Sequence, residues 1–274
     1  MCIRDRDSSV IKLRKEAIGG VQTNIIQFQG SNPDMPTVFY HPGIFGSLEN
    51  LVKQNIPRLA LESGCSFLAL NTIAQDSQGT YPPRNIDFDL CMEIIEQGID
   101  SYVTGSGIIP ILNSWGSFPT TLAIQNCFDI KVKSVLGIGA TLNAHKVIRA
   151  KLEGLFNDGV LSADIKQAFN AGETIQAPFP NGMTVNVNKA FFEAHDGKIS
   201  TNSTIHVENQ IICIRGEDDE YVTDQDTDGI TAIYKNTVEA DKRAINGGHS
   251  DNKEQEIATA LTEITNTCKL ALAA

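Results

Sequence analysis

Short apolar β-type runs alternate with helical segments through most of this chain, and this alternation limits the folds open to it. Each run has the length of a buried strand, and most are followed by a stretch with helical character. Parallel strands need helical crossovers, so the pattern predicts an α/β fold with a mostly parallel central sheet flanked by helices. The predicted strands are residues 37–41, 66–71, 108–112, 134–138, 210–215 and 242–245, and the predicted helices are residues 48–63, 87–102, 120–126, 144–156, 162–171, 229–235 and 251–272.

The first residues are set apart from this fold. Residues 1–8 carry charges with no following apolar stretch, so they are not a secretory signal, and they resemble an adaptor-derived opening. We expect them to form a disordered or artefactual tail. The β-type runs 10–14 and 21–28, separated by Gly19-Gly20, predict an antiparallel hairpin.

The regular alternation stops between residues 141 and 209. This segment contains the two helical pieces 144–156 and 162–171, an Asn181-Gly182 hairpin turn, and Phe191 and Phe192 among several phenylalanines. A helical, aromatic insertion after a central strand predicts a lid over a pocket. Most of its rings are expected simply to pack the lid onto the sheet. The expected organisation is therefore a core of residues 9–140 and 210–274 with a lid insertion at 141–209.

Composition excludes several classes of function. The net charge of −11 and the pI near 4.9 argue against binding to nucleic acid or to an anionic membrane surface. No stretch reaches the length of a membrane span. The six cysteines lie far apart without a C-x-x-C motif, which is typical of reduced thiols rather than of a disulfide framework or a zinc site. We expect a cytoplasmic protein and make no prediction about its oligomeric state.

A serine lies where the strand 108–112 passes into the helix 120–126. A serine at such a turn has its hydroxyl pushed out of the sheet, which is the geometry of a nucleophile elbow. Gly116 and Ser117 supply small residues after Ser114, and the following helix points its N-terminal amides toward it. The pattern departs from G-x-S-x-G at Leu112. An ordinary loop serine is the alternative interpretation.

Two further loops end predicted strands and carry the partners that such a serine needs. Functional groups gather at the carboxyl ends of strands in a parallel sheet. Asp219 follows one strand and His249 follows a Gly-Gly turn after the next, in the order nucleophile, acid, histidine. Asp218 competes with Asp219 for the role of the acid. The alternatives are a simple acidic turn and a helix-start histidine.

The loop 42–46 follows the first predicted core strand. It could present the Ile44 amide to an oxyanion, together with the amide of Trp115. Gly43 and Phe45 of this loop, with Phe191 and Phe192 of the insertion, are the candidate pocket residues. The Trp115 ring is expected beside the nucleophile, partly filling an apolar pocket.

The remaining polar motifs do not predict a metal site. His145, His195 and His206 show no metal-type spacing and are expected on the surface, while His41 is expected to be structural. Residues 224–229 match the first half of a calcium loop, but position 12 is Lys235, where a glutamate is required. We interpret them as a helix-capping acidic turn. No metal and no cofactor are predicted.

Taken together, these motifs resemble those of the α/β-hydrolase superfamily over nearly the whole chain. The matching pieces are Pro42-Gly43-Ile44-Phe45-Gly46-Ser47, with Pro42 in place of the family's histidine, then Asn113-Ser114-Trp115-Gly116, the acid loop 216–222, and Gly247-Gly248-His249. The insertion is similar to that of bacterial carboxylesterases of the feruloyl/cinnamoyl type. It is also similar to that of the acyl-ACP thioesterases of bacterial bioluminescence, whose elbow likewise lacks the first glycine.

The resemblance implies a serine hydrolase that cleaves carboxylic esters of short to medium acyl chains through an acyl-enzyme. In that reading Ser114 is the nucleophile, His249 the base and Asp219 the acid. The first alternative is an acyl thioesterase or acyltransferase acting on acyl-CoA or acyl-ACP. The second is a non-catalytic binding protein on the same fold, suggested by Leu112 and by Pro42. The expected partner is a small-molecule ester or thioester.

Overall fold

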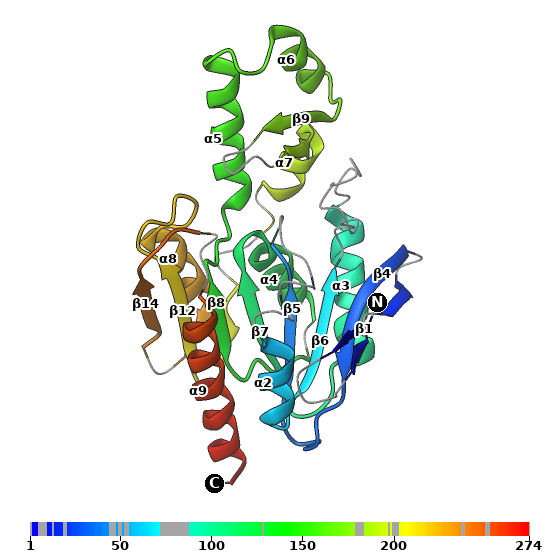
Figure 1. The fold of residues 1–274 in the computed structure, drawn as a ribbon, viewed down its shortest axis with the longest axis vertical. Helices are drawn as coiled ribbons and strands as arrows, with labels where there is room; N and C mark the ends of the chain where they lie inside the picture. The colour runs from blue at the N-terminus through cyan, green and yellow to red at the C-terminus, as the bar shows by residue number, and fades with distance from the viewer. Residues whose placement is uncertain are drawn as a thin grey trace.

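The computed structural model describes most of the chain. Figure 1 shows a central sheet with helices on both sides and a group of elements beyond one end of it. The residues that it does not describe are 1, 5–9, 13, 19–20, 44–47, 49–50, 52–54, 72–87, 128, 179–183, 197, 199–202, 237–238, 250–252 and 274.

The main sheet has eight strands in the described part of the chain. Neighbours are parallel from β14 through to β6, whereas β4 pairs antiparallel with both β6 and β3. The predicted mostly parallel sheet is therefore confirmed. In spatial order the strands are β14 (Asp241–Ile245), β12 (Ile211–Gly216), β8 (Val135–Ile138), β7 (Ile108–Asn113), β5 (Thr37–His41), β6 (Ser66–Asn71), β4 (Val21–Phe28) and β3 (Arg14–Ile18).

Alternate side chains of the central strands enter two separate cores. On β5, Phe39 belongs to one core cluster, whereas Val38 and Tyr40 belong to the other. The first cluster includes side chains of α3 (Phe88–Tyr102) and α4 (Ser117–Asn126). The second includes side chains of α2 (Ile56–Glu62) and α9 (Glu254–Ala273). Helices therefore cover both faces of the sheet, which is why these strands are apolar on both sides.

The chain between β8 and β12 forms a separate group of elements. Its α5, α6, β9 and α7 stand beyond the carboxyl ends of the parallel strands, at the top of Figure 1. From here on, "the insertion" means residues 144–196, which contain these elements and form the larger part of the predicted lid segment 141–209. β9 and β10 pair antiparallel as the predicted hairpin, although its predicted turn at Asn181-Gly182 lies outside the described residues. The elements are α5 (Ala144–Asn157), α6 (Ala163–Asn170), β9 (Ile175–Pro178), β10 (Thr184–Val187) and α7 (Lys189–His195).

Smaller elements flank the main sheet. β11 (Ile205–His206) pairs parallel with β13 (Tyr234–Lys235), which directly follows α8 (Asp224–Ile233). No helix in the described part of the chain is long and apolar enough to cross a membrane. The free thiols among the described residues include Cys65, Cys91, Cys127, Cys213 and Cys268.

The N-terminal hairpin is antiparallel, as predicted, but its first strand differs from the predicted one. Residues Arg14–Ile18 (β3), rather than 10–14, pair with β4, because a two-residue connection sets Ile18 directly opposite Val21. Residues Val10–Lys12 (β2) pair instead with Cys2–Arg4 (β1). The strand β1 lies within residues 1–8, the expected tail.

Two predicted helices have different boundaries. The helix expected at 48–63 is interrupted at Asn55, whose φ of 57° is left-handed, and α2 starts just after it with Pro57 in its first turn. α8 begins at Asp224 rather than near residue 229, because Thr223 and Asp226 form a capping box there. The acidic residues of the half calcium motif therefore cap and open this helix.

The two-sided core gives a stability prediction. Phe39 is fully buried in the central strand β5, so we expect Phe39→Ala to lower the free energy of unfolding by about 3–5 kcal/mol. Leu270→Ala is the matched control, because Leu270 on α9 is 72% exposed, and its effect should stay within about 0.5 kcal/mol. Chemical denaturation measures both changes. Equal changes for the two variants would contradict the assigned core.

Candidate active site

Ser114 lies at a sharp turn from β7 into a short 3-10 helix, η1 (Ser114–Gly116), which continues into α4. Its φ is 49°, in the left-handed region that side chains rarely occupy. Such a backbone costs about 1–3 kcal/mol and persists only where the surrounding structure imposes it. Strand, strained serine and helix thus follow one another in a sharp turn, which we call the elbow.

The loop after β5 lies directly against this elbow. A Cβ atom at Gly43 would lie 2.9 Å from the Cβ of Ser114, and one at Gly116 would lie 2.5 Å from the His41 carbonyl oxygen. Only glycine allows both approaches. The Asn113 side chain donates a hydrogen bond to the hydroxyl of buried Tyr40 at 2.8 Å, which fixes the end of β7 to β5.

Leu112, where the G-x-S-x-G pattern has glycine, does not prevent the turn. Its side chain is buried in the core cluster that includes Trp115. In the sheet, Leu112 lies between His41 on β5 and Gly137 on β8.

A chain of hydrogen bonds connects Ser114 to His249 and Asp219. The Ser114 Oγ lies 2.9 Å from His249 Nε2. His249 Nδ1 lies 2.9 Å from Asp219 Oδ2 and 3.0 Å from Oδ1. The side chain of His249 is 17% exposed, and that of Asp219 is fully buried. The three residues follow the carboxyl ends of β7, β14 and β12, which is where the sequence places them.

Asp219 is held as a carboxylate by the groups around it. Burial alone would raise its pKa, but the hydrogen bond and charge of His249 and the amides of Tyr221 and Val222, each 2.9 Å from Oδ1, lower it overall. Asp218 is exposed and offers its backbone amide to the Gly247 carbonyl at 3.1 Å. Of the two aspartates, Asp219 is the one that contacts the histidine.

Two residues that the sequence did not single out enclose the His249 ring. A Cβ at Gly139, whose φ is 50°, would lie 3.1 Å from His249 Cε1. The Tyr221 ring lies 5.1 Å from the imidazole, and the Lys151 ammonium lies 3.5 Å from the centre of the Tyr221 ring. Lys151 belongs to α5, so the insertion contacts the acid loop. The sequence signal that could have identified Gly139 is its position directly after a predicted strand.

The sequence predicts that the Trp115 ring lies beside Ser114 and partly fills an apolar pocket, but the ring does not stand free there. It is fully buried, 5.9 Å from the His41 ring and 6.4 Å from the Phe191 ring. The ring therefore belongs to the core. The predicted oxyanion residue Ile44 and the pocket residue Phe45 lie outside the described residues.

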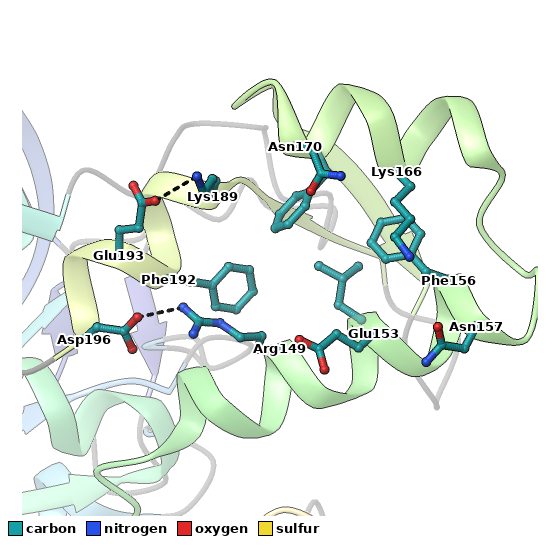
Figure 2. Close-up of a pocket in the computed structure, with 12 residues that line it drawn as sticks. Arg149, Glu153, Phe156, Asn157, Lys166, Asn170, Lys189, Phe192, Glu193 and Asp196 are labelled. Carbon is teal, nitrogen blue, oxygen red and sulfur yellow. Dashed lines mark hydrogen bonds and ion pairs between the residues drawn. The ribbon is translucent and has the colours of Figure 1, made fainter.

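A cavity of about 570 Å³ lies within the insertion, between α5, α6 and α7 (Figure 2). Phe192 reaches this cavity, whereas its neighbour Phe191 packs between Phe192 and Trp115, 5.1 Å from the Phe192 ring. The Arg149–Asp196 ion pair lies along its edge at 2.9 Å. No residue of the Ser114–His249–Asp219 set lines it. The two phenylalanines thus face different surroundings.

The other histidines have separate roles. His145 is 4% exposed, which corrects its expected surface position: it packs edge-on against Phe118, and burial lowers its pKa to about 4. His41 is buried beneath the elbow, where burial lowers its pKa to about 3. His206 is exposed, and the His195 side chain lies outside the description. Within the described chain, no group of three or more His, Cys, Asp or Glu side chains could hold a metal ion.

The lowered pKa of Asp219 gives a pH-dependent stability prediction. Because the folded pKa lies below the unfolded one, Asp219 contributes stability that is fully present above about pH 4 and is lost as the pH falls through the folded pKa. The difference in unfolding free energy between wild type and Asp219→Asn should therefore be larger at neutral pH than near pH 3. Exposed Asp218→Asn is the control and should follow wild type throughout. A constant difference for Asp219→Asn would contradict this account.

No protein-family model matches the chain, and no curated protein sequence matches it. Solved structures do resemble it. A protein from Agrobacterium vitis S4 that is named as a hydrolase has a TM-score of 0.73 at 12% identity, covering 93% of this chain and 99% of that one. Mouse alpha/beta hydrolase domain-containing protein 10 has a TM-score of 0.64 at 13% identity, covering 93% and 97%.

Est1E from Butyrivibrio proteoclasticus, in a structure with ferulic acid bound, has a TM-score of 0.61 at 15% identity. That alignment covers 90% of this chain and 95% of Est1E. At such identities the likeness establishes the fold alone. Together with the strand order and the elbow after β7, it shows that the chain has the α/β-hydrolase fold.

Proposed function

We propose that this protein is a serine hydrolase that cleaves carboxylic esters of short to medium acyl chains through an acyl-enzyme. One observation carries the proposal. The hydrogen-bond chain from Asp219 through His249 ends on the hydroxyl of a serine with a strained, left-handed backbone. Strain of this kind is maintained at functional sites, and the three groups match the roles of nucleophile, base and orienting acid.

In the proposed reaction, His249 Nε2 takes the proton of Ser114 Oγ as the oxygen attacks the ester carbonyl. The tetrahedral intermediate collapses, the ester C–O bond breaks, and the leaving alkoxide takes the proton from His249. Water then attacks the carbonyl of the acyl-enzyme, with His249 again as the base. The carboxylic acid product is released, and the Ser114 hydroxyl is restored. Asp219, ionised and buried, holds Nδ1–H and stabilises the imidazolium.

The oxyanion is proposed to bind the backbone amides of Trp115 and Ile44. Trp115 follows the nucleophile, and its amide lies at the start of the turn that opens α4. Gly43, which precedes Ile44, is in contact with Ser114. This contact supports a second donor from the same loop, because preorganised amides act best close to the developing charge.

The solved structures support the class of reaction. They include a protein named as a hydrolase and, with a TM-score of 0.55, an esterase from Pyrobaculum calidifontis, and the Est1E structure holds ferulic acid, a carboxylic acid. A thioester would be attacked by the same three groups, so an acyl thioesterase or acyltransferase is the second hypothesis. Hydrogen-bond distances below 3 Å from serine to histidine and from histidine to carboxylate favour an active enzyme over a non-catalytic binding protein.

We propose further that residues 141–209 act as the lid of this site. The insertion stands beyond the carboxyl ends of the strands (Figure 1), and Lys151 on α5 contacts Tyr221 beside His249. Phe191 of α7 packs against Trp115, the residue that follows Ser114, with 6.4 Å between the ring centres, and this contact supports it as the candidate wall of the acyl pocket. The free thiols support a reducing compartment, which we propose is the cytoplasm.

Replacing the nucleophile tests the reaction. Ser114→Ala should lower kcat on p-nitrophenyl butyrate by roughly 10⁴- to 10⁶-fold, while circular dichroism and the melting temperature stay close to wild type. Ser117→Ala is the matched control three residues later: its buried hydroxyl has no hydrogen-bond partner in the described structure, so activity should persist. Wild-type turnover by Ser114→Ala would overturn the proposal.

A series of acyl lengths tests the pocket. Each CH₂ buried in open apolar space contributes about 0.8 kcal/mol, so kcat/KM should rise several-fold per carbon from acetyl to butyryl or hexanoyl esters and then fall. Phe191→Ala should move the maximum to longer chains. Phe192→Ala is the control, because Phe192 reaches the cavity inside the insertion.

Two results would contradict this picture of the pocket. One is activity that keeps rising through lauroyl esters, and the other is a profile that Phe191→Ala leaves unchanged. The same series on acyl-CoA thioesters separates the two hypotheses. Higher kcat/KM on the thioester than on the matched oxygen ester would favour the thioesterase.

A further inference from the structure

Lys253 is a buried lysine at the start of α9, four residues after His249. It is 3% exposed. Its ammonium donates hydrogen bonds to the carbonyl oxygens of Gly248 at 2.7 Å and of His249 at 3.1 Å. Its own carbonyl accepts the first hydrogen bond of the helix, from the Ile257 amide at 2.9 Å, so Lys253 occupies the N-cap position.

A lysine is an unfavourable choice for the helix itself. N-cap positions favour Ser, Thr, Asp and Asn, whose oxygens accept bonds from the first amides, and lysine has no acceptor. The N-terminal end of a helix carries a partial positive charge that repels a cation. Removing an ammonium from water adds a further cost. The stability of α9 therefore does not explain why a charged side chain is buried here.

Both of these carbonyl oxygens belong to the loop that carries His249. On its other side this loop is held by the acid loop, where the Asp218 amide donates to the Gly247 carbonyl and the Glu217 amide donates to Ile245. The loop is thus anchored between the Asp219 segment and α9. The backbone of His249 sets where its ring lies, between Asp219 and Ser114.

We propose that Lys253 is a positioning residue that fixes the His249 backbone, so that the imidazole meets Ser114 and Asp219 together. This inference rests on the proposed function. Without the ammonium, the Gly248 and His249 carbonyls lose the hydrogen bonds that it donates, and the loop relaxes. The imidazole then shifts away from Ser114. Misplacement of a catalytic group by about 1 Å lowers the rate by about 10²-fold.

The test compares Lys253→Met, which keeps length and loses the donor, with Lys253→Arg, which keeps a cationic donor. On p-nitrophenyl butyrate, we expect Lys253→Met to lower kcat by about 10- to 100-fold with KM within about twofold, because the substrate contacts are intact. Lys253→Arg should recover a large part of kcat. Lys269→Met removes an exposed lysine from the same helix and should match wild type.

A proton NMR readout makes the test independent of turnover. The His249 Nδ1–H shared with Asp219 should give a downfield resonance in wild type that is absent in Asp219→Asn. Lys253→Met should broaden or shift this resonance, and Lys269→Met should leave it in place. If wild type cleaves no ester, the proposed function fails, while this resonance still decides the role of Lys253.

Three results would overturn the inference. One is Lys253→Met with kcat within twofold of wild type. Another is an unchanged histidine resonance in that variant. The third has two parts: Lys253→Arg does not restore kcat, and the loss of kcat in Lys253→Met equals the loss of its folded fraction, as thermal melting measures it. Lys253 would then be a purely structural residue.

Discussion

The left-handed backbone of Ser114 is the constraint on which the rest of the site depends. A serine adopts a φ of 49° only where its surroundings leave no relaxed alternative. Here Gly43 and Gly116 let the loop after β5 close against the elbow, and Asn113 holds the end of β7 through Tyr40. Larger residues at either glycine would meet backbone or Ser114 itself. The turn therefore points the hydroxyl out of the sheet and leaves the Trp115 ring buried below it.

The parallel sheet brings the other two groups to this hydroxyl. β7, β8, β12 and β14 are successive neighbours, so their carboxyl ends lie along one edge. Ser114 and His249 are 135 residues apart in sequence and 2.9 Å apart in space. Gly139, at the end of β8 between them, leaves room for the His249 ring. The geometry of the site thus follows from strand order together with glycines at three points of close approach, Gly43, Gly116 and Gly139.

Much of this arrangement could be predicted from the sequence, because strand periodicity and glycine-bearing strand ends are local signals. The strands Thr37–His41 and Ser66–Asn71 and the placement of Ser114, Asp219 and His249 are of this kind. Packing is not local. The burial of Trp115 and His145 and the role of Gly139 depend on contacts between distant segments. Lys253 carried no sequence signal, because a lysine near a helix start is ordinary until its burial and its acceptors are known.

The central claim is that Ser114 is activated by its hydrogen bond to His249 at a strained turn. Labelling of the folded protein with a fluorophosphonate, followed by mass spectrometry of its peptides, tests this claim most directly. The account predicts a single phosphonate adduct, located on Ser114, that does not form in the denatured protein. An unlabelled folded protein, or an adduct on another residue with Ser114 unmodified, would contradict it.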